Sequence, residues 1–181
     1  MITTAVRDEA AKLHQACREI GFFTVKDFGA SPAEIAAIFH LAHGFSALPT
    51  DEKMKIRTHT DYGCLTLLAQ DAVGGLEVKP KGKDWTTVSY ELDTFIVNIG
   101  DLMQQWSNNV FQSTPHRVVP PLGKHRYAIP FFLEPNSKTR IECFPSCVTP
   151  EHPCQYRPIF SDNWITSKFN QTYAYRVGKV V

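Results

Sequence analysis

From residue 59 to residue 135 the chain consists of short apolar segments separated by turns that contain Gly, Pro or Asn. Side chains in these segments follow a strand-like period, whereas the residues before them follow a helical one. This succession of short strands predicts an antiparallel sandwich or barrel. The predicted strands are 59–69, 74–80, 85–91, 94–100, 112–119 and 126–135, with a short helical segment at 101–109.

The N-terminal residues 1–56 are predicted to be mainly helical. One helix start is well marked, because Ser31 can cap it, Pro32 occupies its first position and Glu34 completes a capping box. The tail from residue 135 is rich in proline. The predicted elements outside the strand-rich part are a helix at 4–20, a strand at 22–28, a helix from 32, a turn at 51–56 capped by Thr50, and a helix at 164–176.

The composition fits one folded domain, or a core with a small appendage. Of the 181 residues, 43% are hydrophobic and 20% are charged, which is enough for a single packed core. The formal net charge is +1 without a basic stripe, so we expect no nucleic-acid partner. We find no apolar segment long enough to cross a bilayer and no secretory signal, so we expect a cytoplasmic protein with no membrane partner.

The cysteines are scattered and odd in number, which favours reduced thiols over a disulfide framework. A loose cluster near the C-terminus could hold a structural zinc ion, but its spacing matches no compact zinc pattern. We therefore favour ordinary loop cysteines. The cysteines are Cys17, Cys64, Cys143, Cys147 and Cys154, and the loose cluster is Cys143, Cys147, His152 and Cys154.

Two residues of the first predicted strand are candidate metal ligands. His59 and Asp61 are two apart, so in a strand both side chains point to the same face, as two ligands of one metal must. Leu65 and Leu67 would share that face and either line a pocket or belong to the core. Alone, a His-x-Asp triplet is weak evidence, because a surface strand or a capped turn explains it as well.

His116 is the candidate third ligand, because it lies in the predicted strand 112–119 while the other histidines lie on helices or in turns. Two imidazoles and one carboxylate on facing strands form the facial arrangement that suits non-haem Fe(II) and leaves coordination positions open. A buried, hydrogen-bonded histidine is the alternative interpretation.

Arg126 begins the last predicted strand and shares a face with Ala128 and Pro130. An arginine that points into an apolar interior is costly unless it meets an anion, and a guanidinium suits a carboxylate. Taken in isolation, a surface ion pair is the simpler explanation.

Together these motifs resemble the isopenicillin N synthase-like branch of the Fe(II)- and 2-oxoglutarate-dependent oxygenases. The motifs occur in the order of that family and the resemblance covers nearly the whole chain. They are "HQACREIGFF", "LPTDEKMKI", "HTDYGCLTLLAQD", "GGLEV", "TFIVNIGDLMQQWSNNVFQSTPHRVV" and "RYAIPFFLEPN".

The resemblance implies a mainly β protein with flanking helices, namely an incomplete double-stranded β-helix (jelly-roll) preceded by N-terminal helices. It divides the chain into an N-terminal helical region, 1–56, and a jelly-roll core with a C-terminal tail, 57–181. His59, Asp61 and His116 match the iron ligands of the family. Arg126 matches the arginine that binds the distal carboxylate of 2-oxoglutarate.

The chain departs from the family most clearly before the first ligand. Family members have a long segment there that includes a helix, a strand near the metal and a tyrosine of the 2-oxoglutarate pocket, whereas only Arg57 and Thr58 separate Ile56 from His59. Removing a strand exposes a sheet edge. We therefore expect a homodimer in which a second copy covers that edge.

Two substitutions also depart from the family pattern. Ala128 replaces the serine that helps to hold the same carboxylate, so 2-oxoglutarate binding is expected to be roughly ten- to a hundredfold weaker. Asn109 stands where relatives often have glycine, and asparagine tolerates a positive φ.

The resemblance implies an oxygenase that uses Fe(II), 2-oxoglutarate and O2 to oxidise an unidentified small molecule. The alternative is an impaired or inactive truncated member that acts as a metal-binding or interaction module. A cupin-like metal-binding jelly-roll is a third interpretation, and the position of Arg126 after His116 argues against it.

Overall fold

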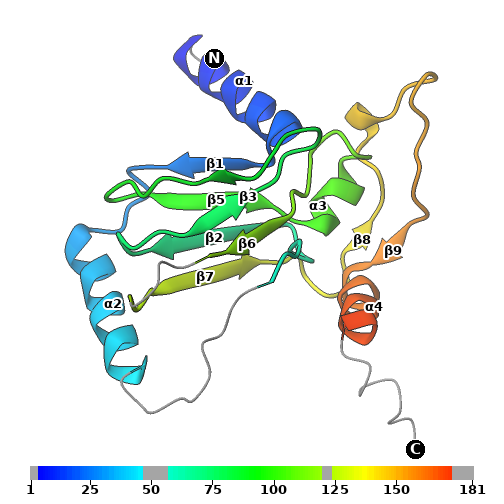
Figure 1. The fold of residues 1–181 in the computed structure, drawn as a ribbon. Coiled ribbons are helices and arrows are strands. Elements are labelled where there is room, and N and C mark those ends of the chain that lie inside the picture. The colour runs from blue at the N-terminus through cyan, green and yellow to red at the C-terminus, as the bar shows by residue number, and fades with distance from the viewer. Residues whose placement is uncertain (1–3, 47–56, 120–123, 173–181) are drawn as a thin grey trace, which may run out of the picture.

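The strands of the molecule lie in two facing sheets and a separate pair (Figure 1). The computed structural model describes residues 4–46, 57–119 and 124–172. All paired strands are antiparallel, as the short strands and tight turns predict. The larger sheet has the order β1 (Phe22–Val25), β5 (Phe95–Ile99), β2 (Leu65–Gln70), β7 (Ala128–Leu133); the smaller has the order β4 (Thr86–Thr87), β3 (Leu76–Val78), β6 (His116–Val118); β8 (Arg140–Ile141) pairs with β9 (Ile159–Phe160).

The helices agree with the predicted ones to within a few residues. Ser31 and Glu34 form the expected capping box, in which the Ser31 N–H donates to Glu34 Oε2 at 2.7 Å and the Glu34 N–H donates to Ser31 Oγ at 3.3 Å. The turn predicted at 51–56 lies outside the described residues. None of the described helices is long and apolar enough to cross a membrane. The helices are α1 (Thr4–Glu19), α2 (Pro32–Ser46), α3 (Asp101–Trp106), the 3-10 helix η1 (Pro145–Cys147) and α4 (Ser161–Thr172).

One hydrophobic core fills the space between the two sheets. It is built from β1, β3 and β5, with β2 contributing Leu68 at its border. β1 comes from the N-terminal region and pairs with β5 in the larger sheet, so this region is part of the sandwich. The buried members are Phe22, Leu76, Val78 and Ile96.

A second core lies against the start of β2 and is covered by α3, α4 and the β8–β9 pair (Figure 1). Leu65 packs here, which corrects the prediction that it shares a face with the candidate metal ligands. The buried members are Cys64, Leu102 and Ile141.

The prediction of a continuous strand from residue 59 is wrong, because β2 begins only at Leu65. His59 makes an isolated bridge with His116, and the residues that follow it form bends. This interruption changes which side chains of β2 lie on the same side as Asp61. Thr66, rather than Leu65 or Leu67, therefore contacts Asp61.

The prediction of reduced thiols is wrong for two cysteines, because Cys143 and Cys154 form a disulfide with their Cα atoms 6.1 Å apart. They therefore cannot be zinc ligands, while Cys147 is free. Buried Asn108 draws this loop together, since its Nδ2 donates to the carbonyls of Cys147 at 3.1 Å and Pro153 at 3.2 Å. Sequence spacing could not reveal a fold-back of this kind.

β7 is an edge strand of the larger sheet within the described residues. The side chains of Phe131 and Phe132 are 62% and 56% exposed, and Leu133 is also exposed. Pro130 lies in the same strand, and edge strands are where proline is tolerated. The larger sheet therefore presents apolar side chains at this edge within the described residues.

The first turn of α3 holds the segment that carries Asp61. The N–H of Asp101 donates to the Asp61 carbonyl at 2.7 Å, and the N–H of Leu102 donates to the Gly63 carbonyl at 3.1 Å. These are N–H groups that a helix start leaves without an intrahelical partner. Gly100, at the N-cap, makes this close approach possible, because a Cβ there would lie 2.2 Å from the Gly63 oxygen.

We expect Gly100→Ala to destabilise the protein by about 1–3 kcal/mol, because the added methyl group would push the backbone at Gly63 away from α3. Gly63→Ala is the matched control, since the atoms nearest to a Cβ there belong to the flexible Glu134 side chain, at 1.9 Å, which can move aside. Urea denaturation of both variants measures the difference. Equal stability of the two variants would contradict the role given to this backbone contact.

Candidate metal centre

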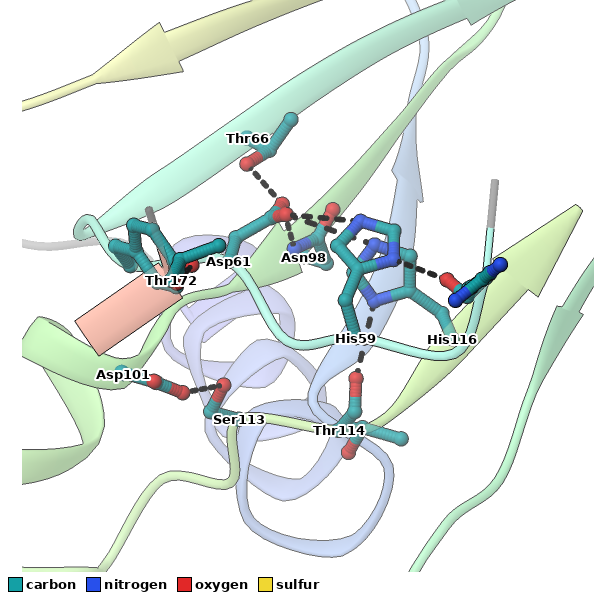
Figure 2. Close-up of polar contacts among 11 residues, drawn as sticks. His59, Asp61, Thr66, Asn98, Asp101, Ser113, Thr114, His116 and Thr172 are labelled. Atoms are coloured by element: carbon teal, nitrogen blue, oxygen red, sulfur yellow. Dashed lines mark hydrogen bonds and ion pairs between the residues drawn. The ribbon is translucent and has the colours of Figure 1, made fainter. Parts of the chain in front are cut away.

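Three side chains from two distant parts of the chain converge beside the smaller sheet (Figure 2). One ligand atom each from His59, Asp61 and His116 lie within 4.8 Å of one another. The two histidines are brought together by their backbones, because the His59 N–H donates to the His116 carbonyl at 3.0 Å and the reverse bond is 2.9 Å. The predicted three-residue set is therefore assembled, although His59 and Asp61 are not in a strand.

The hydrogen bonds of the imidazole rings point one nitrogen of each ring toward Asp61. His59 Nδ1 lies 2.8 Å from the Arg57 carbonyl and His116 Nδ1 lies 3.1 Å from the Thr114 carbonyl. Because a carbonyl only accepts, each Nδ1 carries the proton and each Nε2 presents its lone pair. Both Nε2 atoms lie 3.6 Å from Asp61 Oδ1.

Burial helps to keep His116 neutral. It lowers the pKa of His116, an effect that the nearby His59 reinforces and that the Asp61 charge and the Thr114 carbonyl partly oppose. A neutral imidazole is the form that binds a metal ion.

The two oxygens of the Asp61 carboxylate have different surroundings. Oδ2 accepts hydrogen bonds from the Thr66 hydroxyl and from Asn98 Nδ2, the latter at 2.8 Å, while Oδ1 faces the imidazoles (Figure 2). Thr66 and Asn98 are cross-strand neighbours in β2 and β5. Such hydrogen bonds fix the orientation of a metal-binding carboxylate.

The donor set fits a divalent ion of the first transition series. Two imidazole nitrogens and one carboxylate oxygen on one side leave the opposite coordination positions open, which is the arrangement typical of non-haem Fe(II) oxygenases. The side chain of His59 is 40% exposed, so the centre is open to solvent on that side.

Arg126 lies at the far end of β2 from Asp61. Its Nε donates to the Gly74 carbonyl at 2.6 Å and its Nη2 to Gln70 Oε1 at 3.4 Å. It forms no ion pair with a carboxylate of the described residues. Burial lowers the pKa of Arg126, and the charge of Asp71 only partly offsets this. Arg126 is therefore a partly buried cation suited to an anionic ligand.

Sequence reasoning missed the polar residues that line the inner face of β2. Thr66 and Gln70 are buried and share this face, and Asn98 of β5 joins them. The available signal was the strand sequence "LTLLAQ", in which polar residues recur four apart and therefore on one face. Their partners, however, are set by the register between strands.

Comparison with known proteins also indicates a non-haem Fe(II) oxygenase. Residues 36–135 match the family model of the 2OG-Fe(II) oxygenase superfamily. The chain is 37% identical over 135 residues to the 2-oxoglutarate-Fe(II) type oxidoreductase hxnY of Emericella nidulans, covering 71% of this chain and 38% of the relative. It is 36% identical over 151 residues to gibberellin 2-beta-dioxygenase 7 of Arabidopsis thaliana, covering 80% of this chain and 44% of the relative. The chain thus spans less than half the length of these relatives.

The fold is shared with a solved dioxygenase structure. The dioxygenase for auxin oxidation of rice superimposes with a TM-score of 0.82 at 19% identity, covering 94% of this chain and 92% of that chain. This likeness confirms the predicted jelly-roll.

Removing the hydroxyl that holds Asp61 should weaken metal binding. We expect Thr66→Val to lower the affinity for Fe(II) about 10- to 100-fold, because Oδ2 loses a hydrogen bond that orients the carboxylate. Thr86→Val, in exposed strand β4, is the matched control. Anaerobic titration with Fe(II) measures the effect, and equal affinities in the two variants would contradict it.

Proposed function

The chain belongs to the 2OG-Fe(II) oxygenase superfamily, and on this basis we propose that it is a non-haem oxygenase of the isopenicillin N synthase-like branch that oxidises a small organic molecule. The observation that carries the proposal is the convergence of two Nε2 lone pairs and one carboxylate oxygen, from His59, His116 and Asp61. When bound, Fe(II) and 2-oxoglutarate supply the oxidising chemistry, in which decarboxylation of the keto acid and reduction of O2 are coupled to oxidation of the substrate.

The role of the protein would be to hold the metal ion and to orient the groups around it. His59, Asp61 and His116 would hold the metal ion from one side and leave the other side for the keto acid and O2. Thr66 and Asn98 would keep Asp61 turned toward the ion.

Arg126 would anchor the distal carboxylate of 2-oxoglutarate. Thr66, which contacts Asp61, and Gln70, which contacts Arg126, lie four residues apart in β2, or about 13 Å along an extended strand. A short dicarboxylic acid that bridges the metal ion and Arg126 would span this distance. Ala128 offers no hydroxyl there, so binding is expected to be weaker than in relatives with serine.

The primary substrate is left open by the proposal. The relatives and neighbours are named for different molecules, a gibberellin in one case and an auxin in another. They support a reaction class and a small-molecule substrate. Because His59 is 40% exposed, a substrate beside it would be only partly enclosed.

The second candidate function is that of an impaired family member acting as a metal-binding or interaction module. Two features favour it, namely the short connection of Arg57 and Thr58 before His59 and the exposed apolar side chains of β7. Asp61→Ala separates the candidates, since it should abolish turnover in an oxygenase and leave an interaction module unaffected.

Anaerobic addition of Fe(II) and 2-oxoglutarate together should produce a visible metal-to-ligand charge-transfer band. We expect the band only with both components, because the keto acid must chelate an ion that the protein holds. His116→Ala should abolish it, whereas His125→Ala, an exposed histidine outside the cluster, should leave it intact.

Fe(II) binding without a band would mean that the centre is present and the 2-oxoglutarate pocket is not, which would support the module. Failure to bind Fe(II) would contradict both the metal centre and the proposed activity.

We also propose that a second copy of this chain covers the edge at β7. Phe131 and Leu133 are exposed on one face of β7 and Phe132 on the other, and a sheet edge that carries exposed apolar side chains favours association.

Sedimentation velocity should therefore show a dimer that Phe131→Glu converts to a monomer, because a charge would be buried in the interface. Phe160→Glu is the control, since Phe160 is an exposed phenylalanine of β9, outside β7. A monomeric wild-type protein would contradict the dimer.

A further inference from the structure

The side-chain amide of Gln70 is a buried donor without a partner. Gln70 is only 8% exposed, and its Nε2 is the one buried side-chain nitrogen or oxygen of the described residues that makes no hydrogen bond. The orientation of the amide follows from chemistry, because its other atom, Oε1, faces Nη2 of Arg126 and a guanidinium can only donate. Unsatisfied buried donors are costly and rare, so this one calls for an explanation.

The strand register places this donor beside the cation of the site. Gln70 in β2 lies directly opposite Ala128 in β7. Arg126 is two residues before Ala128, and its guanidinium reaches Gln70. Gln70 also shares the inner face of β2 with Thr66, which contacts Asp61. The free N–H therefore belongs to the surface that connects Arg126 with the metal centre.

Arg126 and Gln70 each lack a partner that an anionic ligand would supply. Arg126 has no ion-pair partner among the described carboxylates, and Gln70 Nε2 has no acceptor. The methyl group of Ala128 satisfies neither of them. One carboxylate has enough oxygen lone pairs to accept from both the guanidinium and the amide.

We propose that Gln70 binds the distal carboxylate of 2-oxoglutarate through Nε2–H, beside Arg126, and so supplies the donor that Ala128 cannot. This inference rests on the proposed function, because it assumes that 2-oxoglutarate occupies the site. It makes Gln70 a specificity-determining residue that distinguishes dicarboxylic from monocarboxylic keto acids.

The test compares the dissociation constants of two keto acids for the Fe(II)-loaded, anaerobic protein, followed by the charge-transfer band. We use 2-oxoglutarate and 2-oxobutyrate, which has the same keto acid end and no distal carboxylate. Gln70→Leu should weaken 2-oxoglutarate binding about 10- to 100-fold, as expected for a lost hydrogen bond to a charged group. It should leave 2-oxobutyrate binding and Fe(II) binding unchanged.

A rescue separates direct contact from a structural role. Adding Ala128→Ser to Gln70→Leu should restore much of the affinity for 2-oxoglutarate, because the new hydroxyl lies opposite residue 70. Gln171→Leu, an exposed position of α4, is the matched control and should have no effect. If Gln70→Leu fails to fold, Gln70→Glu provides the test, since its carboxylate would pair with Arg126 and exclude 2-oxoglutarate.

The possible outcomes test the role of Gln70 and the proposed use of 2-oxoglutarate separately. Equal 2-oxoglutarate affinity in wild type and Gln70→Leu, or an equal loss for both keto acids, would overturn the role of Gln70 and leave the proposed function intact. A wild-type protein that binds Fe(II) but gives no band with 2-oxoglutarate would overturn the proposed cosubstrate, and this inference with it.

Discussion

The hydrogen bonds that hold the segment around Asp61 are the constraint on which the site depends. The backbone of this segment accepts N–H groups from the start of α3, and its carboxylate accepts from Thr66 and Asn98. Those contacts fix one oxygen and leave the other turned toward His59 and His116. Neither imidazole would have a facing carboxylate if this turn moved, so the close approach at Gly100 helps to keep the carboxylate in place.

The inside of the sandwich combines an apolar core with a polar stripe. Leu76 and Ile96 are packed between the sheets, while Thr66, Asn98 and Gln70 are buried close by. Buried polar groups are tolerated when they are paired, and Thr66 and Asn98 both donate a hydrogen bond to Asp61. The amide of Gln70 and the guanidinium of Arg126 are incompletely satisfied at the far end of the same stripe. An extended anionic ligand between the metal centre and Arg126 explains this pattern with a single molecule.

Within the described residues the molecule combines a cluster of candidate metal ligands with an edge strand, β7, that carries exposed apolar side chains. The two features lie on different elements, because the candidate centre is held by β2, β5, β6 and α3, whereas the exposed apolar side chains are on β7. The cluster of candidate ligands and the exposed apolar side chains of β7 can therefore change independently of each other.

Local patterns in the sequence determined the helices, the short strands and the capping box at Ser31, because each depends on residues close together in the chain. The family motifs singled out His59, Asp61 and His116 as candidate ligands, and the structure brings these three side chains together. Even the positive φ of Asn109, 64°, follows from its residue type and its place in a turn. The interruption of the first strand, the Cys143–Cys154 disulfide and the partners of Thr66 and Gln70 were decided only by the tertiary structure. Each of them depends on a contact between distant segments, such as α3 with the Asp61 turn or β2 with β7, and strand register across such distances is set by packing that no local pattern records.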